Sequence, residues 1–112
     1  MLSIDPILQL LAKAVDASAL RHSVHVTNVA NVNTEGFSRF EVVVDSLPSD
    51  GATTGDGFAA PEARVVQVPG EAVRLDEEMA AMAQNAVRYQ TLLNAIEKTL
   101  GALRYAAREG RE

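Results

Sequence analysis

The 112-residue sequence contains no cysteine and no tryptophan, and its aromatic residues are only three Phe and two Tyr. The absence of cysteine excludes disulfide bonds, thiol catalysis and thiolate metal sites. With so few aromatics, Ala, Val and Leu carry most of the 47% hydrophobic fraction. That composition suits helix-on-helix packing better than a thick mixed core. The length allows one domain at most.

Positive charge is also scarce, with 10 basic residues against 15 acidic ones and a formal net charge of −5. A nucleic-acid partner is therefore not expected, because phosphate contacts need clustered Lys and Arg. No run of about eighteen apolar residues suggests a membrane-spanning helix. The first basic residue is Lys13, so the start of the chain lacks the charged region of a secretory signal. Any export from the cytoplasm is expected to need no cleaved peptide.

What the sequence does contain is a long apolar repeat in its C-terminal third. Steps of four and three residues alternate without a break, which is the pattern of a helix that packs lengthwise against other helices. Polar residues that fall between these positions, such as Glu78 and Asn85, are expected on the opposite side of the helix. The nine apolar positions, called here the seam, are Leu75, Met79, Met82, Ala86, Tyr89, Leu93, Ile96, Leu100 and Leu103.

A second amphipathic helix is expected near the N-terminus, from about Pro6 to about Val32. Asp5 is a favoured N-cap residue, and proline suits the first helical position because it has no amide to leave unpaired. Apolar residues then recur at helical spacing. The helix is expected to stop in residues 31–36, where Asn and Gly tolerate a left-handed backbone.

Two short strands are expected between the helices. Residues 37–44 and 63–68 are rich in β-branched residues and plausibly pair as a hairpin. Residues 46–61 are mostly turn formers and predict a mobile loop. From Phe40 to Gly70 five acidic residues stand against one basic residue, so the insert is expected to be a solvated, surface-facing element. The predicted fold is mainly α, with two long amphipathic terminal helices packed as an antiparallel coiled-coil hairpin around a small β-hairpin/loop insert. Its segments are 1–36, 37–70 and 71–112.

Catalytic and metal-binding patterns are weak. His22 and His25 stand three residues apart, but neither has an acidic or His partner at the next helical positions, so ordinary surface or interface histidines are favoured over a metal site. The acidic run 76–78 is interpreted as charges that face the positive end of a helix rather than as acid/base carboxylates. No nucleophile elbow or phosphate loop is present. We expect no enzyme activity, no cofactor, no metal and no small-molecule substrate; an enzyme would need a site built on one of the two histidines.

The seam itself has two interpretations. It can be the core-facing side of an ordinary two-helix hairpin. However, the first helix is apolar over nearly half its circumference, and extra alanines widen the apolar side of the second helix. We therefore favour burial of the additional apolar surface against other chains.

Two segments resemble bacterial flagellar rod, hook and hook-associated proteins. In that family an Asn, an Ala-Asn pair, a Thr and a Gly-aromatic pair follow an amphipathic N-terminal helix; here they are Asn28, Ala30-Asn31, Thr34 and Gly36-Phe37. The C-terminal runs 73–79 and 84–90 look most like those of proximal rod proteins. The resemblance covers both ends of the chain.

The resemblance implies a structural role. Rod subunits assemble helically into the axial drive shaft of the flagellar basal body, which crosses the periplasm, and their terminal helices pack against neighbouring subunits. They are exported unfolded by the flagellum-specific type III apparatus. The implied partners are copies of this chain, other rod and basal-body proteins, and the export apparatus. The alternative from another class is a soluble helical-hairpin adaptor or chaperone in the cytoplasm.

The residues expected at the assembly interface are apolar helix positions and signature positions. The amides of Asn28, Asn31 and Asn33 can either satisfy the last helix carbonyls or bridge to a neighbouring helix, or they can simply form a helix stop. The full set is Leu8, Leu11, Val15, Asn28, Asn31, Thr34, Gly36, Phe37, Met79, Met82, Ala86, Tyr89, Gln90, Leu93, Ile96 and Leu100.

Overall fold

The computed structural model describes residues 4–45 and 62–110, which form two long helices and a two-stranded sheet. The elements in chain order are α1 (Ile4–Ala30), β1 (Phe40–Val44), β2 (Ala63–Gln67) and α2 (Leu75–Glu109). The expected mainly helical fold, with a small antiparallel sheet between the helices in sequence, is confirmed. Neither helix, over the residues searched, combines the length and the apolar character that a membrane crossing requires.

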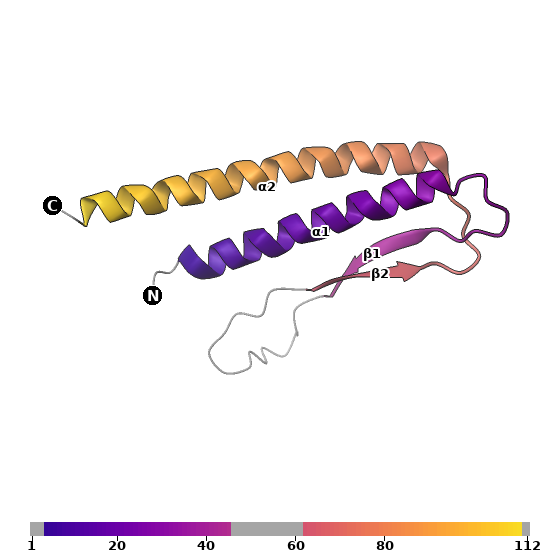
Figure 1. Ribbon diagram of the computed structural model, residues 1–112, viewed down its shortest axis with the longest axis horizontal. Helices are drawn as coiled ribbons and strands as arrows, with labels where there is room; N and C mark the ends of the chain where they lie inside the picture. Colours follow the sequence, from indigo (N-terminus) through magenta and orange to yellow (C-terminus); the bar gives the residue numbers. More distant parts are fainter. Residues whose placement is uncertain (1–3, 46–61, 111–112) are drawn as a thin grey trace.

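The elements lie in a row rather than around a centre. Figure 1 shows α2 beside α1, the two running in opposite directions, with the sheet on the far side of α1. The principal extents are 65 × 32 × 15 Å, so the molecule is little thicker than one helix with its side chains. Its radius of gyration is 18.3 Å, against about 13 Å for a compact domain of this length. Each helix is therefore exposed on both wide faces of a slab.

Helix α1 differs from its predicted bounds by two residues at each end. It already includes Ile4 and Asp5, so the prediction that Asp5 is the N-cap is wrong. It ends at Ala30 because the following backbone turns: the amide of Asn31 is shared between Thr27 O at 3.2 Å and Asn28 O at 3.1 Å. Such bifurcated bonds are common where a helix tightens at its end.

The turn after α1 follows the expected chemistry. The hydroxyl of Thr34 donates to Asn31 Oδ1 at 3.1 Å, and Asn31 Nδ2 donates back to the carbonyl of Thr27 at 2.9 Å. Gly36 has φ +77°, a left-handed conformation that favours glycine. The amide of Phe37 then donates to Thr34 O at 3.2 Å. Phe37 therefore belongs to the turn, and β1 starts three residues later than predicted.

The sheet pairs Phe40 with Gln67 at one end and Val44 with Ala63 at the other. Arg39 extends the pairing toward α2, because its amide donates to Glu71 O at 2.8 Å and its carbonyl accepts from Val68 N at 2.9 Å. The strands contact α1, and every residue of β1 except Val44 is at least half-buried. The prediction of a wholly solvated insert is thus wrong for the strands. The predicted mobile loop 46–61 lies outside the described residues.

Helix α2 begins at Leu75, as predicted. Three carboxylates occupy its first turn, where the helix dipole favours negative charge. Asp76 and Glu77 are exposed, as expected of dipole-facing charges, but Glu78 is only 7% exposed. The prediction that Glu78 lies on the solvent side of α2 is therefore wrong.

The buried centre of the molecule is more polar than apolar. Among the described residues, the buried apolar side chains are those of Ala17 and Val24. The buried polar ones are Ser18, Asn28, Glu78 and Asn85. Asn85, like Glu78, was expected on the polar side of α2 and instead faces α1. So little buried apolar surface provides only a weak hydrophobic contribution to stability.

Candidate assembly surface

The side chain of Asn28 joins three elements near the end of α1. Its Oδ1 accepts the amide of Phe40 at 2.9 Å, and its Nδ2 donates to the carbonyl of the same residue at 2.8 Å. The same Nδ2 also donates to Glu78 Oε1 of α2 at 3.1 Å. The amide thus copies the two-bond pairing of a β-strand at the start of β1 and holds α2 at the same point. Asn28 has no exposed surface, so water does not compete for these bonds.

Glu78 is the counterpart of Asn28 on α2. Its second oxygen, Oε2, lies 2.6 Å from Nδ1 of His25, one turn before Asn28 on α1. A buried carboxylate requires hydrogen-bond partners for both oxygens. Here Oε1 accepts from the amide of Asn28, and Oε2 is hydrogen-bonded to the imidazole of His25. No buried side-chain polar atom among the described residues lacks a hydrogen-bond partner. The junction is therefore a satisfied polar contact between the helices.

A second polar contact lies further from the turn. The hydroxyl of Ser18 donates to Asn85 Oδ1 at 3.0 Å, and Asn85 Nδ2 donates to the carbonyl of Ser18 at 2.8 Å. Both side chains are buried. Glu78 and Asn85 are separated by two helical turns, so the two contacts define both the register and the rotation of α2 relative to α1.

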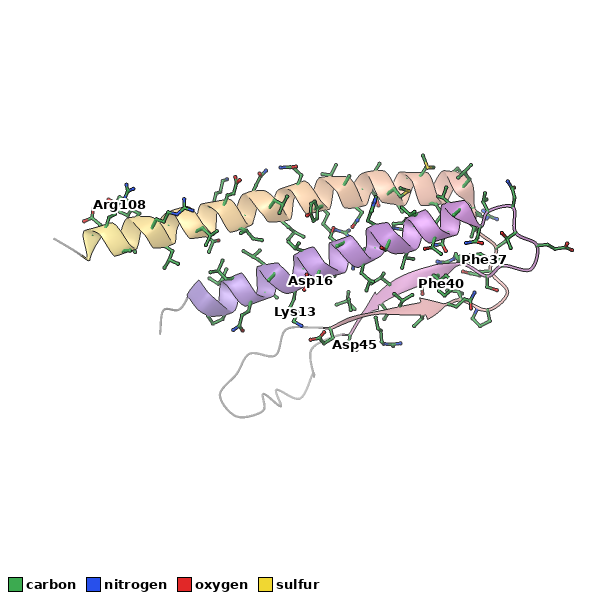
Figure 2. The ribbon with its side chains drawn as sticks, viewed as in Figure 1. Lys13, Asp16, Phe37, Phe40, Asp45 and Arg108 are labelled. Atoms are coloured by element: carbon green, nitrogen blue, oxygen red, sulfur yellow. The ribbon has the colours of Figure 1, made fainter. Side chains whose placement is uncertain are left out.

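Ion pairs of Arg39 and Lys13 lie at the two ends of the sheet. Arg39 contacts Glu71 at 2.6 Å and Glu41 at 3.1 Å; although burial alone lowers the pKa of Arg39, hydrogen bonds to these two carboxylates raise it above its usual range. Lys13 contacts Glu62 at 2.6 Å, and that hydrogen bond raises the pKa of Lys13. Figure 2 shows Lys13 extending from α1 toward the end of the sheet where Asp45 lies, and Phe37 beside Phe40 at the opposite end. These aromatic rings meet edge to face, with centroids 5.7 Å apart.

The rotation of α2 leaves part of the seam uncovered. Its hydrogen bonds to α1 come from positions 78 and 85, each one residue before a seam position. A shift of one residue turns a helix by about 100°. As a result Leu75 is 47% exposed, Met79 54% and Tyr89 39%. The interpretation of the seam as the core-facing side of a simple hairpin fails for these residues.

The uncovered seam forms one wall of a groove between the helices. A hollow of about 370 Å³ is lined by Ala19 and His22 of α1 and by Ala86 and Tyr89 of α2, with Ser18 and Asn85 at its base. The strands contribute no residue to this lining. We call the surface formed by Ala19, His22, Met79, Ala86 and Tyr89 the bare face.

The bare face continues along both helices at helical spacing. On α1, residues at steps of three and four from Ala19 share its side, and Val26 there is 46% exposed. On α2, the seam continues through Leu93 to Leu100, both half-buried. Apolar residues thus follow the same side of both helices, and contiguous exposed apolar surface is typical of interaction sites.

The residues expected at the assembly interface separate into three groups. Asn28 is buried in the junction within the chain, and Asn31 and Thr34 are engaged in the turn. Half-buried positions are Leu8, Leu11, Val15, Phe37, Met82, Leu93, Ile96 and Leu100. Exposed positions are Gly36, Met79, Ala86, Tyr89 and Gln90. For the asparagines, Asn28 bridges to the neighbouring helix and Asn31 satisfies a helix carbonyl, which are the two roles anticipated for them.

Sequence reasoning missed Ser18, His25, Glu78 and Asn85 as contacts between the helices. The only available signal was their polar type at positions that lie next to apolar stripes. Partners 50 to 67 residues away cannot be recognised from local spacing. Over the described residues, no three His, Cys, Asp or Glu side chains cluster as metal ligands.

No model of a known protein family matches the chain, and no curated protein is found to be similar to it. The resemblance of residues 26–39 and 84–90 to flagellar rod proteins therefore stays a hypothesis.

Proposed function

We propose that this protein is a structural subunit of the bacterial flagellar basal-body rod, most like the proximal rod protein FlgB. In this role it assembles through its terminal helices with copies of itself and with other rod and basal-body proteins. The flagellum-specific type III apparatus exports it without a cleaved signal peptide, and it resides in the rod where the drive shaft crosses the periplasm.

The observation that carries the proposal is the contrast between a nearly absent core and a long bare face. The two apolar side chains that are buried in the described part of the chain, Ala17 and Val24, cannot by themselves offset the conformational entropy of ordering two long helices. Meanwhile four seam residues, Leu75, Met79, Ala86 and Tyr89, remain exposed. Burying them against a neighbouring helix would supply the missing stabilisation, which is the arrangement of an assembly subunit.

The polar junction gives this surface a defined shape. Ser18–Asn85 and Asn28–Glu78 hold the helices so that Ala19 and Ala86 face the same groove. Small side chains at its centre allow a third helix to approach closely. We propose that neighbouring subunits pack into this groove in coiled-coil fashion, with the seam residues as knobs.

Genetic complementation tests the proposal directly. In the source bacterium, deletion of the gene is expected to abolish swimming and to leave basal bodies without a complete rod in electron micrographs. The full-length chain should restore both, whereas Ala86→Glu should restore neither at equal protein level. Lys98→Glu, at an exposed position outside the seam, is the matched control and should complement fully. A motile deletion strain with intact basal bodies would reject the rod assignment.

The alternative function is a soluble helical-hairpin adaptor or chaperone in the cytoplasm. It is favoured by the fully satisfied polar junction, which holds the two helices together within one chain. Circular dichroism over a dilution series separates the two. An adaptor should show constant helicity and one cooperative melting transition down to low concentration, whereas a rod subunit should gain helix as it assembles.

A further inference from the structure

Arg21 of α1 and Arg88 of α2 face each other on the side of the hairpin opposite the bare face. They line a common cavity of about 250 Å³ together with residues of β1, among them Glu41 and Val42. Both also line a second hollow near Val44. The pKa of Arg21 is lowered, first by burial and then by the charge of Arg88. The two like-charged guanidinium groups thus share both hollows.

This arginine pair differs from most of the basic residues around it. Lys13, Arg39, Arg64 and Arg74 each form an ion pair with a carboxylate at 3.4 Å or less. Among the described residues, Arg21 and Arg88 form none; Lys98, Arg104 and Arg108 form none either but do not line this cavity. The two carboxylates in the cavity are already engaged, Glu41 by Arg39 and Glu78 by His25. Although the chain is acidic overall, the positive charges of Arg21 and Arg88 thus line one cavity between the two helices. Such an arrangement costs stability in the isolated subunit unless an anion joins it.

We infer that the Arg21–Arg88 cavity is a receptor site for a carboxylate side chain of a second copy of this chain. Guanidinium groups bind carboxylates through paired N–H donors, and two groups from different helices can hold one carboxylate between them. The second copy then supplies a carboxylate that forms no ion pair within its own chain.

Charge complementarity identifies a second copy as the occupant. The chain carries five more acidic than basic residues. Among the described side chains, the carboxylates that form no ion pair are those of Asp16, Glu35, Asp76, Glu97 and Glu109. All five are exposed. None of them lines the arginine cavity, so the contact joins different patches on the two copies. Such a contact can be reciprocated in a two-fold dimer or repeated from copy to copy in a ring or an open helix.

The inference rests on the proposed function, since both require copies of the chain to meet, but it adds a specific polar contact on the other face. Chemical cross-linking tests it. The variant Arg88→Lys keeps the positive charge and supplies an amine that a carbodiimide joins to a contacting carboxylate. Full-length protein is prepared in natural and ¹⁵N-labelled form, mixed under assembling conditions and cross-linked. Mass spectrometry then distinguishes links within one copy from links between copies.

The expected result is a mixed-isotope cross-link between position 88 and a carboxylate of another copy. The matched control is Arg104→Lys, at an exposed position of α2 outside the cavity. Only within-copy links from position 88, or mixed links no more abundant than those from position 104, would overturn the inference. If the full-length chain restores motility in the deletion strain but cross-linking gives that negative result, the arginine site alone is overturned and the rod assignment stays in place.

A charge-removing variant supplies an independent measurement. Arg88→Gln should weaken self-association in sedimentation equilibrium by about tenfold or more. Because Arg88→Gln removes a repulsion between like charges, the thermal midpoint of the monomer should be unchanged or raised. Misfolding therefore cannot explain the weaker self-association. Inorganic phosphate is the probe for a simple anion site. If phosphate raises the midpoint of the wild type while Arg88→Gln associates normally, the cavity binds small anions only and the inference is wrong.

Discussion

The amide of Asn28 donates to the carboxylate of Glu78 across 3.1 Å, joining the last turn of α1 to the first turn of α2. The same amide pairs with the backbone of Phe40. One side chain therefore connects both helices and the sheet at the end of the molecule where the chain reverses (Figure 1).

Replacing Asn28 by alanine should lower the free energy of unfolding by about 3 kcal/mol, because it leaves the amide of Phe40 and one oxygen of Glu78 without their buried partner. Urea unfolding followed by circular dichroism measures the change. Asn33→Ala is the matched control, since Asn33 is exposed, and it should shift stability by no more than about 0.5 kcal/mol. Equal effects of the two variants would contradict the junction.

Glu78 and its neighbour Glu77 provide a second comparison. Glu78→Ala removes the partner of both His25 and Asn28 from a buried position and should cost about 2–4 kcal/mol. Glu77→Ala removes an exposed carboxylate from the same helical turn and should cost under about 1 kcal/mol, mostly through the helix dipole. If the order of the two were reversed, Glu78 would be a dipole-facing charge as the sequence suggested.

The bare face should matter for assembly and not for folding. Ala86→Glu and Met79→Glu place a charge on exposed helix positions, so the free energy of unfolding of the dilute monomer should change by about 0.5 kcal/mol or less. In contrast, co-sedimentation with purified rod subunits should be lost, because a buried unpaired charge is costly at a packed interface. Lys98→Glu should co-sediment normally. Normal co-sedimentation of both Ala86→Glu and Met79→Glu would exclude the bare face as the interface.

Replacing each of two glycines by alanine should change the stability of the protein in opposite directions. Gly36 has φ +77° and open space around it, so Gly36→Ala introduces backbone strain without a clash and should destabilise by about 1–2 kcal/mol. Gly101 lies inside α2, also with nothing near its absent Cβ. Gly101→Ala should therefore stabilise by up to about 1 kcal/mol through helix propensity. Thermal melting of the pair in parallel checks both signs.

The elements of the fold could be predicted because their signals are local. Alternating steps of three and four residues from Leu75 onward marked α2, and β-branched runs marked the strands that pair from Phe40 to Val44. The Asn-rich turn with a left-handed Gly36 was predictable on the same basis. Each of these preferences acts within a few residues along the chain, where spacing and residue type suffice.

The packing face of α2 was decided only by tertiary structure. The sequence favoured the apolar seam as the contact with α1, yet Glu78 and Asn85 face α1 instead. They do so because Asn28, His25 and Ser18 of α1 provide hydrogen-bond partners for them. Hydrophobic periodicity identifies which residues avoid water but not which of two chains covers them. Hydrogen-bond partners distant in sequence determine how α2 is rotated within the chain, and that rotation leaves Leu75, Met79, Ala86 and Tyr89 of the seam exposed.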